Sequence, residues 1–71
     1  MVKFDRHARR RMKWRKISEA DVIKTLENPE ITEDTIKGRK NAYRLIGDRF
    51  IKVTYKIYLQ EIIVISAVVK D

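Results

Sequence analysis

One histidine and an excess of lysine and arginine are the residues of this 71-residue chain whose types suit chemistry on a charged group. His7 is the only side chain here whose ordinary pKa, about 6.5, allows proton transfer in both directions near neutral pH. Lysine and arginine stabilise negative charge on phosphate oxygens through charge-assisted hydrogen bonds. Together these residue types suit proton transfer at a phosphate group, with His7 carrying the proton and the cations binding the phosphate.

The net charge indicates a polyanionic partner. The chain carries 17 lysines and arginines against 10 acids, which gives a formal net charge of +7 and an isoelectric point near 10.0. Cations that neutralise phosphates release condensed counterions, and this release dominates non-specific affinity for nucleic acids. We expect a nucleic acid, and RNA first, as the partner. The simpler alternative is the lysine-rich surface of a thermophilic protein.

The charges are distributed in blocks along the chain. Residues 1–16 carry eight cations and one acid, residues 17–36 carry six acids and one lysine, and residues 37–58 carry seven cations and one acid. A uniformly solvated surface would mix the two signs. We therefore expect the two basic segments to form two walls of one site, with the acidic segment facing away from it.

Composition also limits the classes of site. The chain has no cysteine, so it forms neither disulfides nor cysteine-based zinc sites, which fits a reducing cytoplasm. Its acids do not converge from separate elements, Asp5 and His7 alone are too few for a metal site, and its two glycines form no phosphate-cradling loop. No apolar stretch approaches the roughly 20 residues that span a bilayer. We expect no metal, no cofactor, no membrane insertion and a cytoplasmic location.

A basic helix is predicted near the start of the chain. Asp5 is a good N-cap, and Phe4, Ala8 and Met12 recur every four residues as one apolar stripe. Trp14 follows near the end of this helix, where we interpret it as a core residue rather than a stacking surface. The remaining positions are mostly arginine and lysine, which must face water or a ligand.

A second helix is predicted between Ser18 and Asn28-Pro29. Ser18 and Asp21 have the spacing of a capping box, and Ile17 and Val22 have that of a hydrophobic staple. A proline cannot continue the helix, so the segment ends at this point. This helix carries structural signals and no candidate site residue.

Strands are predicted over the rest of the chain, at residues 30–36 (an edge strand), 42–46, 49–59 and 62–69. Gly47-Asp48 is interpreted as the two-residue turn of a hairpin, and a second turn is expected near Gln60-Glu61. Two N-terminal helices packed on an antiparallel meander of three or four strands form the simplest assembly. The prediction is a single α+β domain over residues 1–71.

The predicted strand at 49–59 alternates between two faces. One set of side chains should meet the helices: Ile51, Val53, Tyr55, Ile57 and Leu59. The other set should face outwards: Phe50, Lys52, Thr54, Lys56 and Tyr58. A basic face with interleaved aromatic rings suits backbone phosphates and stacked bases.

The sequence resembles a family of small uncharacterised bacterial and archaeal domains. Residues 7–12, His-Ala-Arg-Arg-Arg-Met, match the H-A-x-x-R-M opening of that family. Its later motifs follow in the same order: Arg15, Ile17-Ser18, Asn28-Pro29, Ile51-Lys52-Val53 and Val64-Ile65-Ser66. Two departures are Lys16, where the family usually has Gly, and the lack of a Tyr after Ser66. These domains are similar to the RelE- and BrnT-like toxins of toxin–antitoxin systems.

The resemblance implies a RelE/BrnT-like fold and a type II toxin that cleaves RNA without a metal by attack of the 2′-hydroxyl. The RNA can be mRNA on the ribosome, and an acidic antitoxin would restrain the activity. The implied positions are His7 and Arg11 on the first helix with Lys52 and Ser66 on the sheet, of which the first three are the catalytic candidates. The candidate RNA contacts are Arg10, Arg39, Lys40, Arg44, Thr54, Lys56 and Ser66.

Each catalytic candidate has a structural alternative. His7 lies beside the apolar stripe, where a histidine often only packs and bonds to the backbone. Arg11 can be a solvated residue or the partner of an acid on the second helix. Lys52 can protect an edge strand against aggregation, and Ser66 can bond within the sheet.

Two other functions also fit the sequence. A non-catalytic nucleic-acid-binding module would use the same basic faces and tolerate loss of His7. A protein-interaction domain would dock its basic surface on an acidic partner and bind RNA weakly. A chain of this length buries only about 60% of its unfolded surface, so a homodimer would also stabilise it.

Overall fold

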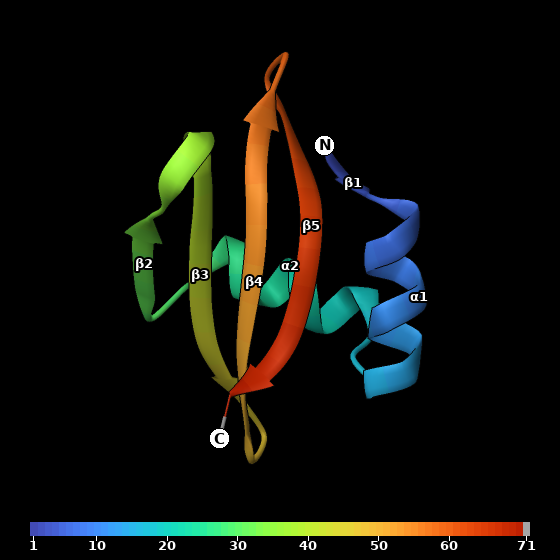
Figure 1. Cartoon of the computed structure of the whole chain (residues 1–71). Coiled ribbons are helices and arrows are strands. Elements are labelled where there is room, and N and C mark those ends of the chain that lie inside the picture. The colour runs from blue at the N-terminus through green and yellow to red at the C-terminus, as the bar shows by residue number, and fades with distance from the viewer. Residues whose placement is uncertain (71) are drawn as a thin grey trace.

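The protein forms a five-stranded mixed sheet with two helices on one face (Figure 1). The computed structural model describes residues 1–70. The elements in chain order are β1 (Val2–Phe4), α1 (Arg6–Arg15), α2 (Glu19–Glu27), β2 (Ile31–Asp34), a 3-10 turn (Ile36–Gly38), β3 (Arg39–Ile46), β4 (Arg49–Tyr58) and β5 (Glu61–Lys70). The strands lie in the order β1-β5-β4-β3-β2, with α1 packed on β5 and α2 on β3 and β4.

Strand β1 corrects the predicted sheet. The order of two helices followed by an antiparallel meander is right, but β1 adds a further strand and pairs in parallel with β5. Val2 lies opposite Ile62 and Phe4 opposite Val64. Phe4 therefore ends a strand instead of opening the helical stripe, and it contacts the core from there. Three residues before the Asp5 cap are too few to show a strand period, and their partner lies at the other end of the sequence.

The two turns of the meander are both tight. Gly47-Asp48 connects β3 to β4 as predicted, and Gly47 supplies the positive φ of +62° that the turn requires. The turn between β4 and β5 is Leu59-Gln60, one residue earlier than expected, with φ angles of 50° and 65°. Leu59 was expected to face the core from the strand; it lies in the turn and is 77% exposed.

The core lies between the helices and one face of the sheet. Its buried side chains are Ala8, Met12, Ile17, Val22, Ile51, Val53, Val64 and Ala67. The prediction that Ile51 and Val53 face the helices is confirmed, and Tyr55 is partly buried against the same cluster. Ile57 continues this face beyond the helices and is exposed. Burial of an aliphatic side chain contributes about 1.5–3 kcal/mol. This cluster is therefore the main apolar contribution that holds the helices on the sheet.

Trp14 lies outside the core, contrary to the prediction. Its side chain is 86% exposed, whereas Met12 of the same helix is buried. Two residues along an α-helix differ by about 200° in direction. Because Ala8 and Met12 face the sheet, Trp14 must point away from it.

Both helices begin at the predicted caps. The carboxylate of Asp5 accepts a hydrogen bond from the backbone N–H of His7 at 2.8 Å. The hydroxyl of Ser18 accepts one from the backbone N–H of Asp21 at 3.0 Å. Helix α2 ends at Glu27, and its C-cap, Asn28, immediately precedes the only proline of the sequence.

Two arginines join the helices to the sheet. The guanidinium group of Arg49 on β4 donates to the carbonyl of Lys16 at 3.0 Å and to the carboxylate of Asp21 at 3.2 Å. Arg15 of α1 donates to the carbonyl of Ala67 on β5 at 2.9 Å. Hydrogen bonds to charged groups contribute about 1.5–3 kcal/mol each, so these contacts supplement the apolar core.

Lys16 carries a conformational cost that predicts a stabilising substitution. It ends α1 in the left-handed conformation with φ of 57°, which costs a residue with a Cβ atom about 1–2 kcal/mol. We expect Lys16→Gly to raise the free energy of unfolding by about 0.5–1 kcal/mol, since glycine enters this conformation freely. Urea denaturation followed by circular dichroism measures the change. The control, Arg10→Gly within α1, should lower stability by about the same amount. A loss of stability in Lys16→Gly would contradict this explanation.

Candidate functional site

The sheet face turned away from the helices is the candidate site. Because Ile51 and Val53 point into the core, Phe50, Lys52 and Thr54 point to the opposite side of β4. The register sets side chains of β3 and β5 beside them in two rows. The first row is Tyr43, Lys52 and Val68, and the second is Asn41, Thr54 and Ser66. We call this surface the open face.

A chain of hydrogen bonds crosses three strands of the open face. The hydroxyl of Thr54 donates to Oδ1 of Asn41 at 2.8 Å, and Nδ2 of Asn41 donates to Oε1 of Glu33 at 2.9 Å. The hydroxyl of Tyr43 donates to the same Oε1 at 2.5 Å. Asn41 is only 5% exposed, so the network fixes its orientation. The chain of bonds places one carboxylate at the β2–β3 side of the open face.

Electrostatics fix the protonation of this network. The hydrogen bond from Tyr43 lowers the pKa of Glu33 most, followed by that from Asn41 and by the attraction of Lys52 and Lys70. The same hydrogen bond raises the pKa of Tyr43 above its ordinary value. At neutral pH the open face therefore presents a carboxylate and a protonated phenol beside Lys52 and Lys70.

Aromatic rings lie among these charges. The rings of Tyr43 and Phe50 stack with centroids 5.7 Å apart and planes 20° apart. Further along β4, the ammonium group of Lys56 lies 6.0 Å from the centre of the Tyr58 ring. Rings that alternate with cations offer stacking surfaces for bases beside contacts for phosphates.

Some of the sequence-predicted residues meet on the open face. Lys52, Thr54 and Ser66 lie in adjacent rows, as the alternation of the strands predicts. Arg39 and Lys56 are register partners and follow the same side of the sheet at its β2–β3 end. These residues extend from the start of β3, after the 3-10 turn, to the middle of β4.

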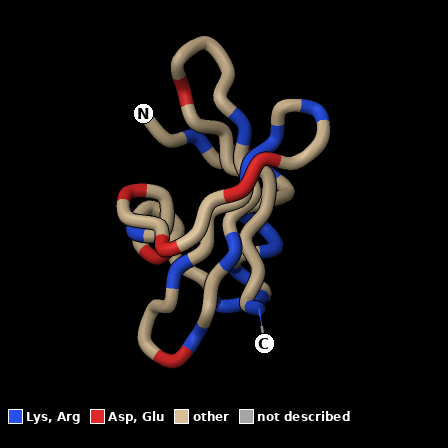
Figure 2. The backbone as a smooth tube through the Cα atoms, turned by 90° about the vertical axis from the view of Figure 1, so that its left-hand side faces the viewer, with Lys and Arg blue, Asp and Glu red and all other residues tan. Residues whose placement is uncertain are grey.

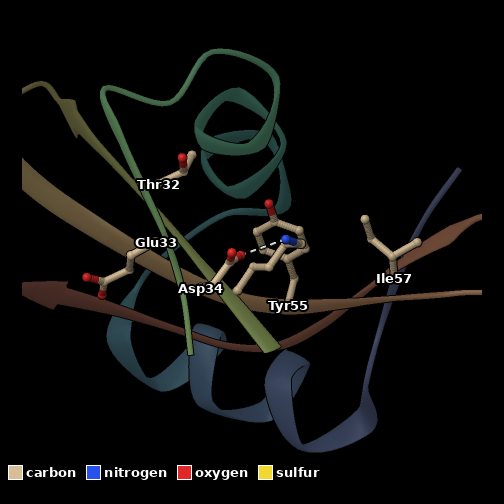
Figure 3. A pocket seen from close by; sticks show the side chains of 6 residues that line it. Thr32, Glu33, Asp34, Tyr55 and Ile57 are labelled. Carbon is tan, nitrogen blue, oxygen red and sulfur yellow. Dashed lines mark hydrogen bonds and ion pairs between the residues drawn. The ribbon is translucent and has the colours of Figure 1, made fainter. Parts of the chain in front are cut away.

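Lys40 and Arg44 lie on the helix side of β3 and have partners within the protein. Lys40 binds the carboxylate of Asp34 at 2.7 Å, in a shallow hollow that Tyr55 also lines (Figure 3). The hydrogen bond to Asp34, followed by the attraction of its charge, raises the pKa of Lys40. The guanidinium group of Arg44 donates to the carbonyl of Asn28 at 2.8 Å. Both cations hold β3 to its neighbours.

His7, Arg10 and Arg11 belong to the other layer of the molecule. All three are exposed on α1, which packs on the helix side of β5. Arg10 and Arg11 line a groove with Trp14 rather than the open face. The three catalytic candidates are therefore split, with Lys52 on one side of the sheet and His7 and Arg11 on the other.

Glu33, Asn41 and Lys70 are site residues that sequence reasoning missed, and so is the contact of Tyr43 with Glu33. The acids of residues 17–36 were expected to face away from the site, and those of α2 lie on the helix side, where Glu19 and Asp21 meet Arg9 and Arg49 (Figure 2). Glu33 departs from this pattern because β2 pairs with β3 and sets it opposite Asn41. The alternation of Glu33 with Asp34 in a short strand gave a signal, but only the register identifies its neighbours.

Two further findings concern the described part of the chain. Among residues 1–70, no three side chains of the His, Cys, Asp and Glu types lie together as a metal-ligand set. None of the helices in this part is long and apolar enough to cross a membrane.

Comparison with known proteins identifies the family. A family model described as "Domain of unknown function (DUF4258)" matches residues 4–69, so the chain belongs to this family. The match carries no link to the RelE- or BrnT-like toxins. No curated protein and no solved structure shows a significant match to the chain.

The Tyr43–Glu33 hydrogen bond predicts a shift in acid titration. Because it lowers the folded-state pKa of Glu33 below the ordinary 4.5, its contribution to stability is present above that value and is lost as pH falls through the lowered pKa. We expect Tyr43→Phe to raise the pKa of Glu33 and to weaken the loss of stability in this acid range. NMR titration of the glutamate side-chain carboxyl carbons measures the pKa. Tyr58→Phe, the control, should leave it unchanged; an equal rise in both variants would contradict the assignment.

Proposed function

We propose that this DUF4258 domain binds single-stranded RNA across the open face of its sheet. The observation that carries the proposal is the stacked Tyr43–Phe50 pair beside Lys52 on a face that no helix covers. Base stacking on aromatic rings contributes about 1–3 kcal/mol per base and needs no particular sequence. A formal charge of +7 adds attraction for the backbone.

The cations of the open face supply the phosphate contacts in this proposal. Lys52 and Lys70 lie close enough to Glu33 to lower its pKa. Lys52 lies opposite Tyr43, and Lys70 lies opposite Phe50 at the end of β5. Arg39 and Lys56 extend the positive charge toward one end of the sheet. A strand of RNA running over β3, β4 and β5 would meet rings and cations in turn.

Glu33 supports RNA rather than DNA as the ligand. Both hydrogen bonds that it receives from residues 1–70 end on Oε1, so Oε2 has no donor within that part of the chain. A 2′-hydroxyl is the donor that distinguishes RNA from DNA. An isolated carboxylate repels phosphates, so its place among the lysines favours a sugar contact between two phosphates.

Metal-independent RNA cleavage is the second candidate function, as the resemblance to RelE- and BrnT-like toxins implies. It is favoured by the juxtaposition of a carboxylate, a protonated phenol and Lys52 at one point of the open face. Glu33 would accept the proton of the 2′-hydroxyl as its oxygen attacks phosphorus, and Tyr43 would donate a proton to the 5′-oxygen as the P–O5′ bond breaks. Lys52 would stabilise the charge on the phosphorus oxygens. The lowered pKa of Glu33 makes it a weak base, because an efficient base has a pKa near the working pH. Binding is therefore the function that the geometry supports better.

Substitutions on the two sides of the molecule test RNA binding. We expect Phe50→Ala to weaken binding of a labelled 12-nucleotide RNA by about 1–3 kcal/mol. Lys52→Ala should reduce the slope of log affinity against log salt by about 0.7, the value for one phosphate contact to a single strand. Fluorescence anisotropy over a salt series measures both, and Lys24→Ala on α2 is the control. Equal effects of Lys24→Ala and Lys52→Ala would remove the open face as the site.

Incubation of RNA with the protein in EDTA separates cleavage from binding. If the open face is catalytic, products with 2′,3′-cyclic phosphate ends should form with the wild type and with His7→Ala. They should fall about 100-fold or more with Glu33→Gln, the range that general-base catalysis supplies. Retained RNA affinity in Glu33→Gln controls for folding. Cleavage lost only in His7→Ala would move the chemistry to α1, and binding without cleavage would leave the binding function alone.

A further inference from the structure

Trp14 lies at the centre of an exposed surface on the outer side of α1. It is the only tryptophan of the chain, and its side chain is 86% exposed. Arg10 and Arg11 precede it by four and three residues, so they flank the indole on the helix surface. With Arg15 these residues line a groove, which we call the Trp14 groove.

Three arginines line the Trp14 groove, and they differ in their partners among residues 1–70. Arg15 donates to the carbonyl of Ala67, so it is anchored to the sheet and presents its aliphatic stem. Arg9 lies 3.7 Å from the carboxylate of Glu19 and 5.6 Å from the centre of the Phe4 ring. Among residues 1–70, neither Arg10 nor Arg11 forms an ion pair. The groove therefore combines an apolar floor with two guanidinium groups.

The Trp14 groove is separate from the open face. Helix α1 packs on the helix side of β5, whereas Lys52 and its neighbours lie on the opposite side of the sheet. A single strand of RNA on the open face would not contact Trp14. Exposed tryptophan flanked by arginine is the composition of binding hot spots between proteins, where both residue types are enriched.

We infer that the Trp14 groove docks an acidic segment of a partner protein. An apolar side chain of the partner would lie against the indole and the stem of Arg15, and its carboxylates would pair with Arg10 and Arg11. The protein itself shows the mode of contact, since Arg9 of this helix already meets a carboxylate from a neighbouring helix. Residues 1–16 carry eight cations and one acid, which gives the complementary charge.

The groove favours a peptide over a nucleic acid because of its size. Its positive charge comes from Arg10, Arg11 and Arg15, which lie within five residues of one helix, and its remaining surface is the indole of Trp14. One apolar side chain between carboxylates fills such a site. A nucleic acid strand needs cations spread along its backbone, which the open face offers.

Fluorescence of the single tryptophan reports directly on this site. The probe is a capped 15-residue helical peptide with one leucine flanked by glutamates three and four residues away, and the control peptide has glutamine in place of glutamate. We expect a saturable blue shift of Trp14 emission with the acidic peptide and none with the control. The double variant Arg10→Glu, Arg11→Glu should weaken binding at least about tenfold, since it reverses two charges beside the ligand.

Two further variants separate peptide binding by the groove from RNA binding by the open face and from misfolding. Lys52→Ala should bind the peptide as the wild type does, which separates this inference from RNA binding by the open face. Trp14→Ala should lose affinity when a labelled peptide is followed by anisotropy, and circular dichroism checks that its fold is retained. Equal shifts with both peptides, or no saturable shift, would overturn the inference. A Trp14 shift with single-stranded RNA and not with the peptide would assign the groove to nucleic acid. A shift on raising protein concentration alone would assign it to a second copy of the chain.

Discussion

The alternation of β4 between two environments is the constraint on which the rest of the structure depends. Ile51 and Val53 are fully buried under the helices, and Phe50, Lys52 and Thr54 consequently face the opposite side. A slip of one residue would put a lysine into the core and two aliphatic side chains into water, so the register is strongly specified. Two helices cover only one face of the sheet. The fold therefore creates the open face as a direct result of building its core.

A thin core changes how the net charge should be interpreted. Arg15 and Arg49 join the helices to the sheet, Arg44 binds the end of α2, and Lys40 binds Asp34. These cations stabilise the fold, so the formal charge of +7 overstates what a ligand meets. The remaining charge lies on two separate surfaces, the open face and the outer side of α1. The expectation of one site with two basic walls is replaced by two surfaces on different layers.

Local signals in the sequence predicted much of this fold. The caps at Asp5 and Ser18, the Gly47-Asp48 turn and the two faces of β4 all depend on residues a few positions apart. Strand β1 and the exposure of Trp14 could not be predicted in this way. The first depends on pairing with the far end of the chain, and the second depends on which side of α1 meets the sheet.

The residues of the candidate site also divide into those that local signals predict and those that depend on strand pairing. Lys52, Thr54 and Ser66 were predicted, because strand alternation places each of them on a face. The hydrogen-bonded set of Glu33, Asn41 and Tyr43 was missed, because it forms only when β2 pairs with β3 in the observed register. His7 was predicted from its residue type and from the H-A-x-x-R-M motif that begins with it. Its chemistry is suitable, but the fold places it on the other layer from Lys52.

Chemical-shift mapping by NMR tests the central claim most directly, because it reports on every backbone amide at once. A uniformly ¹⁵N-labelled sample would be titrated with a short uridine-rich RNA at physiological salt. The account predicts that the largest shifts cluster on β3, β4 and β5 around Tyr43, Phe50 and Lys52, with α1 and α2 little changed. Shifts concentrated on α1 around His7 and Trp14, with β4 unaffected, would contradict it.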